Sequence, residues 1–154
     1  MLETGVRAPD FELKDASGRT WRLREMIAKG PVVMAFFKIT CPVCQLTFPF
    51  LERMHRGTGL SIFGISQNDP ESTREFAEEF GVSFPMLFDT EESGYPASNA
   101  YGIAHVPSVF LVEPDGVISR TMEGFDKKAL ESLGTRAGVV TFTERDQVPA
   151  FKAG

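Results

Sequence analysis

Residues 32–44 read VVMAFFKITCPVC, and the class of fold can be inferred from this segment. Its first six residues are apolar at every position, which is typical of a strand that is covered on both faces. Cys41 and Cys44 follow, and apolar residues then recur at helical spacing, as Leu46, Phe50, Leu51 and Met54. The pattern predicts a buried strand that passes into a helix at a Cys-x-x-Cys motif.

Strand-like and helix-like segments alternate along the rest of the chain. Two short strands, 11–13 and 20–23, flank a turn-type cluster at 15–18 and predict a β-hairpin. Further strands are expected at residues 60–65, 84–88, 108–112 and 117–122, helices at 23–29, 70–80 and 126–136, and a helix or two short turns at 93–101. Asp69 before the helix at 70–80 and Gly81 after it are typical capping residues. The alternation predicts an α/β fold with a mixed sheet and helices on both faces.

The composition of the chain excludes several classes of function. The chain has 154 residues, 42% of them hydrophobic, so it is long enough for one domain with a substantial core. The net charge is −5 with no basic patch, so we expect no nucleic-acid partner and no membrane partner. Two cysteines exclude a disulfide scaffold but leave redox chemistry open. Residues 1–10 lack the basic start and apolar stretch of a secretory signal, which predicts a cytoplasmic location.

The chain divides into a domain at residues 1–138 and a C-terminal extension at residues 139–154. Residues 140–143 have strand character, and residues 144–154 are polar and expected to be flexible. A surface extension is the simplest interpretation, and a dimer contact or a lid is also compatible with the sequence. We expect a monomer or a weak dimer.

The position of the cysteines has a chemical consequence. The first N–H groups of a helix have no intrahelical partner, and the positive end of the helix dipole favours an anion. A thiolate on Cys41 would be stabilised there, and a thiolate is the form that attacks a disulfide sulfur. Cys44 lies one helical turn further along and could resolve the resulting mixed disulfide.

Five segments together resemble thioredoxin-fold thiol-disulfide oxidoreductases of the redoxin (AhpC/TSA) branch, which includes TlpA-like and ResA-like proteins and the peroxiredoxins. The resemblance extends over about residues 5–137. Its strongest part combines the Cys-x-x-Cys motif with a Val-Pro-Ser turn ending at Ser108. The five segments are Ala8–Gly18, Ala35–Cys44 followed by Pro49, Val82–Asp89, Gly102–Ser108 and Glu113–Gly116.

The resemblance implies a thioredoxin-like three-layer sandwich with an N-terminal β-hairpin and an inserted βα segment near residues 82–102. It also implies a cis peptide bond before Pro107, which presents the backbone N–H and C=O of Val106 to a substrate chain. Pro42, Val43 and Ile39 would frame a shallow docking surface with Val106 around Cys41.

Several positions depart from the thioredoxin pattern. Thr40 replaces a Trp, Pro42-Val43 replace Gly-Pro, and Ala35 replaces a buried Asp that is thought to relay a proton. Lys38 and Thr40 are candidates for tuning the thiolate, although a lysine at a strand end is usually solvated. His105 is expected to face Cys41 and is a candidate for substrate binding, with an incidental exposed histidine as the competing interpretation.

The sequence predicts a thiol-disulfide oxidoreductase that exchanges with protein disulfides as a reductant, with an unidentified electron donor and no cofactor beyond the redox-active Cys41–Cys44 disulfide. A competing hypothesis is a peroxiredoxin-type peroxidase with Cys41 peroxidatic and Cys44 resolving. That family carries Thr, Pro and Arg near positions 38, 34 and 107, which hold Lys38, Met34 and Pro107 here. A Cu(I)-binding module is a third hypothesis, since thiolates are soft ligands, and a redox-inert interaction domain is a fourth.

Overall fold

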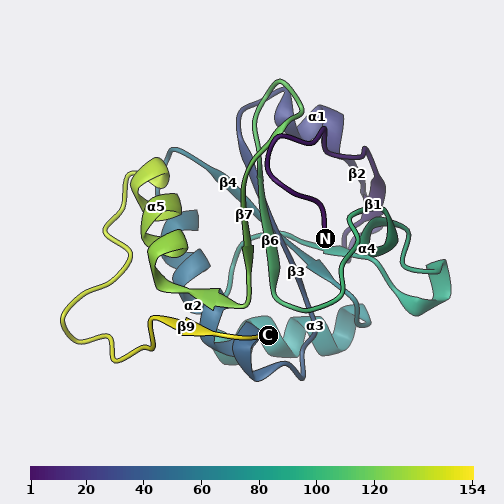
Figure 1. The fold of residues 1–154 in the computed structure, drawn as a ribbon. Coiled ribbons are helices and arrows are strands. Elements are labelled where there is room, and N and C mark those ends of the chain that lie inside the picture. The colour runs from purple at the N-terminus through teal and green to yellow at the C-terminus, as the bar shows by residue number, and fades with distance from the viewer.

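A mixed seven-stranded sheet forms the centre of the molecule in the computed structural model, which describes residues 1–154 (Figure 1). The strand order is β2-β1-β5-β4-β3-β6-β7, and β3 pairs in parallel with β4 and antiparallel with β6. The strands are β1 (Glu12–Lys14), β2 (Thr20–Arg22), β3 (Val32–Phe37), β4 (Ser61–Ser66), β5 (Met86–Phe88), β6 (Ser108–Val112) and β7 (Ile118–Glu123). The strand β3 lies inside the sheet, between β4 and β6, and ends shortly before the cysteine motif.

Five α-helices and one 3-10 turn connect the strands. They are α1 (Leu23–Ile27), α2 (Pro42–His55), α3 (Pro70–Phe80), η1 (Glu91–Ser93), α4 (Pro96–Ala100) and α5 (Lys127–Ala137). The expected caps of α3 are confirmed: the side chain of Asp69 accepts the Ser72 N–H at 2.9 Å, and Gly81 has a φ of 67°. None of these helices combines the length and hydrophobicity needed to cross a bilayer.

Alternation along β3 explains why its sequence is apolar throughout. Val33, Ala35 and Phe37 face a core that is closed by α2, α3 and α5. The intervening residues of β3 face a second core, which is closed by α1 and α4. Helices therefore cover both faces of the sheet, as the sequence predicts, and every β3 side chain is fully buried. Since burying one such side chain contributes about 1.5–3 kcal/mol, this strand is a main source of stability.

The N-terminal hairpin joins the main sheet through β5, because Lys14 pairs with Phe88. The segment at 93–101, expected as a helix or two short turns, contains the last residue of η1 and then the short helix α4. Residues 84 and 85, which were expected to begin a strand, precede β5.

The extension contains the main differences from the sequence-based expectation. Residues 140–143 form no strand and pair with no other strand; within them Val140 is 83% exposed and only Thr141 is buried. Instead, β9 (Phe151–Lys152) pairs antiparallel with β8 (Phe125–Asp126) in a separate two-stranded sheet. The sequence does not indicate this strand, and the expected flexibility of residues 144–154 stays a prediction.

Candidate active site

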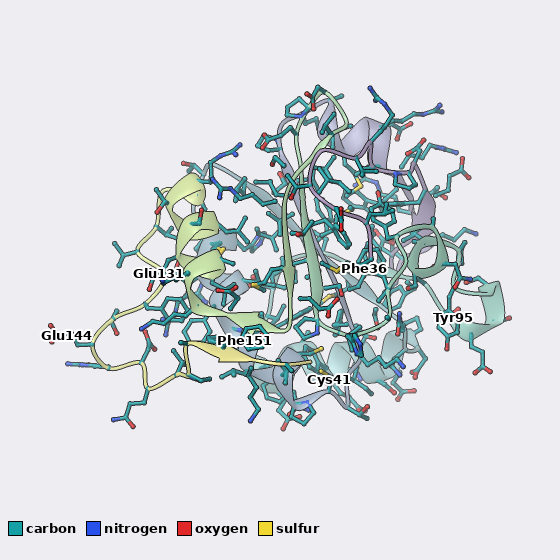
Figure 2. All side chains as sticks on the ribbon, viewed as in Figure 1. Phe36, Cys41, Tyr95, Glu131, Glu144 and Phe151 are labelled. Atoms are coloured by element: carbon teal, nitrogen blue, oxygen red, sulfur yellow. The ribbon has the colours of Figure 1, made fainter.

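The two cysteines lie where β3 passes into α2 (Figure 2). Cys41 is the N-cap residue of α2, and Pro42 is the first residue of the helix. The sulfur of Cys41 accepts a hydrogen bond from the backbone N–H of Cys44 at 3.1 Å. Because this N–H belongs to the first helical turn, the helix satisfies one of its free donors with the cysteine sulfur. The same hydrogen bond would stabilise negative charge on Cys41.

Burial distinguishes the two thiols. Cys41 is partly exposed, whereas Cys44 is fully buried, and both are free. Burial, and secondarily the hydrogen bond to Cys41, raises the pKa of the Cys44 thiol far above its ordinary value. Cys44 therefore keeps its proton at neutral pH, and Cys41 is the sulfur that an approaching molecule can reach.

The loop before β6 faces Cys41. The peptide bond between Val106 and Pro107 is cis. The Cys41 thiol donates to the carbonyl oxygen of Val106, with a sulfur–oxygen distance of 3.4 Å. The hydroxyl of Ser108 donates to the His105 carbonyl at 2.6 Å and holds the turn. A reactive sulfur and a main-chain carbonyl are thus placed side by side.

The loop between β3 and Cys41 is held by two amide side chains. The backbone N–H of Ile39 donates to the Asn68 side-chain oxygen at 2.9 Å. The side-chain nitrogen of Gln45 donates to the Ile39 carbonyl at 3.0 Å. Neither residue has a role predicted from the sequence. A signal for Asn68 was available, because it follows β4, and parallel neighbouring strands such as β3 and β4 end at the same edge of a sheet.

The structure brings together only some of the predicted site residues. Pro42 is exposed beside Cys41, but Val43 is 6% exposed and packs in the core, so it offers little surface for docking. Thr40 is exposed, and so are Lys38 and His105. These three side chains form no hydrogen bond or ion pair, and their roles in tuning the thiolate or binding substrate remain predictions.

No carboxylate takes the place of the buried acid of thioredoxins. Ala35 is fully buried in the same core as Cys44. The one buried carboxylate of α2, on Glu52, accepts the Ser83 N–H at 2.8 Å and the Ser83 hydroxyl at 2.6 Å. Glu52 therefore anchors the segment after α3. No three His, Cys, Asp or Glu side chains lie close enough together to hold a metal ion.

A helix that begins at a Cys-x-x-Cys motif, opposite a cis-proline on a mixed sheet, defines a thioredoxin-like thiol-disulfide oxidoreductase. The sequence profile of the AhpC/TSA family matches residues 4–121, and the chain belongs to this family. The thiol-disulfide oxidoreductase ResA of Geobacillus thermodenitrificans (strain NG80-2) is 32% identical over 141 residues, which cover 86% of this chain and 79% of ResA.

Solved structures support the same fold. The thioredoxin domain of a thiol-disulfide oxidoreductase from Bacteroides vulgatus has a TM-score of 0.78 at 20% identity, covering 89% of this chain and 99% of that one. Peroxidoxin BcpB from Mycobacterium tuberculosis has a TM-score of 0.71 at 23% identity, covering 88% and 98%. Because proteins with both names share the fold, the fold alone does not distinguish exchange from peroxidase chemistry. The ResA relatives support thiol-disulfide exchange, which identifies the chain as an oxidoreductase of the redoxin branch.

Proposed function

We propose that the protein reduces disulfide bonds in polypeptides. In the first step, the Cys41 thiolate attacks one sulfur of the substrate disulfide and forms a mixed disulfide, while the other substrate sulfur leaves as a thiolate. The hydrogen bond from the Cys44 N–H to the Cys41 sulfur, at 3.1 Å, is the observation that carries this assignment.

Cys44 completes the reaction in the second step. Its sulfur attacks the Cys41 sulfur and breaks the mixed disulfide, and the proton of the Cys44 thiol passes to the substrate. The sulfur that left as a thiolate in the first step takes a second proton from water, so the substrate is released as a dithiol, having gained two electrons, and Cys41 and Cys44 become a disulfide. An external dithiol donor of unknown identity must then reduce this pair, with no other cofactor. Reduction fits a reducing compartment such as the cytoplasm.

Polypeptide substrates are favoured by the main-chain groups next to Cys41. An extended substrate segment can pair with main-chain groups such as those of Val106, as in strand addition. The 3.4 Å separation of the Val106 oxygen from the Cys41 sulfur would bring such a segment to the reacting atom.

Trapping experiments test the two roles. Reduced Cys44→Ser and Cys41→Ser variants are mixed with a disulfide-bonded polypeptide such as insulin and separated on non-reducing gels. Cys44→Ser should accumulate a mixed disulfide through Cys41, and Cys41→Ser should accumulate none, because its remaining thiol is buried. Equal trapping by the two variants would contradict the assigned roles, and rapid saturating turnover of hydrogen peroxide by the wild type would favour a peroxidase.

A further inference from the structure

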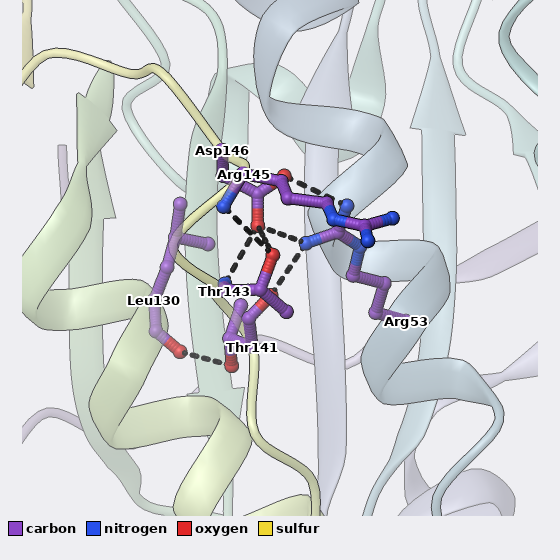
Figure 3. Close-up of polar contacts among 6 residues, drawn as sticks. All are labelled: Arg53, Leu130, Thr141, Thr143, Arg145 and Asp146. Carbon is purple, nitrogen blue, oxygen red and sulfur yellow. Dashed lines mark hydrogen bonds and ion pairs between the residues drawn. The ribbon is translucent and has the colours of Figure 1, made fainter.

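The C-terminal extension, residues 139–154, is fastened to the active-site helix. Both terminal nitrogens of Arg53, on α2, donate to the Asp146 carboxylate, at 2.7 and 3.0 Å, and one of them also donates to the Thr141 carbonyl at 2.7 Å (Figure 3). The Thr143 N–H donates to the same carboxylate at 2.7 Å. The Arg53 guanidinium first, and then the Thr143 N–H, hold the pKa of Asp146 well below its ordinary value. This cluster is the anchor of the extension.

Apolar packing strengthens the anchor. The ring of Phe142 lies 4.6 Å from that of Phe50, measured between centroids, and also contacts Phe125 at 6.2 Å. Val148 packs against the main core as well. The extension up to residue 148 is therefore held by both charge and burial.

Beyond the anchor, residues 149–154 are held differently. All six are exposed, including Phe151 at 59%. Their fixed contacts are main-chain contacts: β9 pairs with β8, and the Lys127 N–H donates to the Ala150 carbonyl at 2.9 Å. A segment with so little buried surface can be displaced at low cost, while the anchor keeps it near its site.

The end of this segment reaches the loop that faces Cys41. Figure 1 shows the end of the chain running from β9 toward the start of α2. Gly154 lies so close to the Val106 carbonyl that a Cβ atom at Gly154 would collide with its oxygen and carbon. The Val106 oxygen is also the atom that lies 3.4 Å from the Cys41 sulfur. The extension thus covers the backbone group beside the reactive thiol.

We propose that residues 149–154 determine which disulfides reach Cys41. Gly154, at the end of this segment, lies against the Val106 carbonyl, so a polypeptide that pairs with this loop must first displace the segment, whereas a small disulfide that needs only the sulfur does not. The segment therefore selects against weakly binding polypeptides. This inference rests on the proposed exchange with polypeptide disulfides.

Deleting residues 149–154 tests the proposal and preserves the anchor, including Asp146 and Phe142. Exchange rates are measured with insulin and with the small disulfide 5,5′-dithiobis(2-nitrobenzoate). We expect kcat/KM for insulin to rise about fivefold through a lower KM. In the wild type, insulin must break one or two main-chain hydrogen bonds of the segment before it binds, and the deletion removes this cost. The rate with the small disulfide should change less than about twofold. This corresponds to a change of less than ~0.5 kcal/mol in the activation free energy.

A second variant keeps the chain length. Gly154→Val places a side chain against the Val106 carbonyl and should release the end of the segment, with the same rise for insulin. Val140→Ser is the matched control, because Val140 belongs to the extension but is 83% exposed and lies outside this contact. Its rates should equal those of the wild type.

Alkylation of Cys41 provides a readout that does not depend on exchange. Both release variants should speed its reaction with a maleimide on polyethylene glycol more than its reaction with iodoacetamide. An unchanged ratio, or a lower insulin rate after deletion, would overturn the proposal; the latter would make the segment part of the substrate surface. Absence of exchange in the wild type with both disulfides would instead overturn the proposed function.

Discussion

The backbone N–H of Cys44 points at the sulfur of Cys41 over 3.1 Å, so the helical turn that buries one cysteine also holds the other. The accessible sulfur is thereby suited to the proposed attack, and the protonated, buried one to the proposed resolution. The division does not depend on an acidic side chain, since Ala35 occupies the position of the buried acid in thioredoxins.

Cys44 should therefore be unreactive over a wide pH range. An unperturbed thiol has a pKa of about 8.5 and becomes reactive as the pH rises through that value. Because burial raises the pKa of Cys44, the neutral thiol persists well above this pH. In Cys41→Ser, alkylation by iodoacetamide, followed by mass spectrometry, should stay slow up to about pH 10. The urea-unfolded variant is the control, and a folded variant that reacts with the same pH midpoint as the unfolded one would contradict this prediction.

Asn68 should act by positioning the loop before the motif. Asn68→Ala leaves the partly buried Ile39 N–H without its acceptor, which should lower the free energy of unfolding by about 1 kcal/mol and slow exchange a few-fold. Urea unfolding and insulin reduction measure the two effects. Asn68→Asp retains an acceptor oxygen and should recover the stability.

The matched control for Asn68 is Asn99→Ala. Whereas the Asn68 side chain accepts one hydrogen bond, the Asn99 side chain donates one, to the Gly94 carbonyl at 2.9 Å, at an exposed site away from the cysteines. Its loss should leave the exchange rate unchanged. A similar decrease in rate for both variants would show that Asn68 has no specific role in positioning the site.

The segments that could be predicted from sequence are those with local signals. Val32–Phe37 is apolar on both alternations because two cores meet at β3, and its bounds are as predicted. Asp69 and Gly81 delimit α3 because caps act within one turn. The cysteine pair is also a local motif. Its position at the start of a helix could be predicted because a buried strand precedes it in the sequence.

The features that could not be predicted depend on distant main-chain groups. β8 and β9 have two residues each, too few for an alternating pattern, and their pairing joins Phe125 to Lys152. Asn68 meets Ile39 only because β4 lies beside β3. Likewise, Gly154 lies close to Val106 because of the path of the whole extension. The type of neither residue indicates this contact.

An ion pair at the end of β6 should contribute to acid sensitivity. Arg136 donates to both oxygens of Glu113 at 2.9 Å. This contact is the largest of the influences that lower the pKa of Glu113 to about 2. The stabilisation is present above the unfolded pKa of about 4.3 and is lost as the pH falls toward 2. Glu113→Gln should remove about 0.5–1 kcal/mol at pH 7, since the pair is partly exposed, and less at pH 2.5. Urea unfolding at several pH values measures this difference, and a pH-independent loss would contradict the linkage.

Gly134, on α5, should resist substitution although it lies inside a helix. At an unconstrained position, Gly→Ala stabilises a helix by about 1 kcal/mol. Here a Cβ atom would collide with the Thr141 hydroxyl oxygen, so Gly134→Ala should instead cost about 1–3 kcal/mol. Thr141→Ala removes that oxygen, and the double variant should recover most of the loss. Urea unfolding of the four proteins forms a double-mutant cycle; a stabilised Gly134→Ala, or additive effects, would show that Thr141 does not pack against α5 in this way.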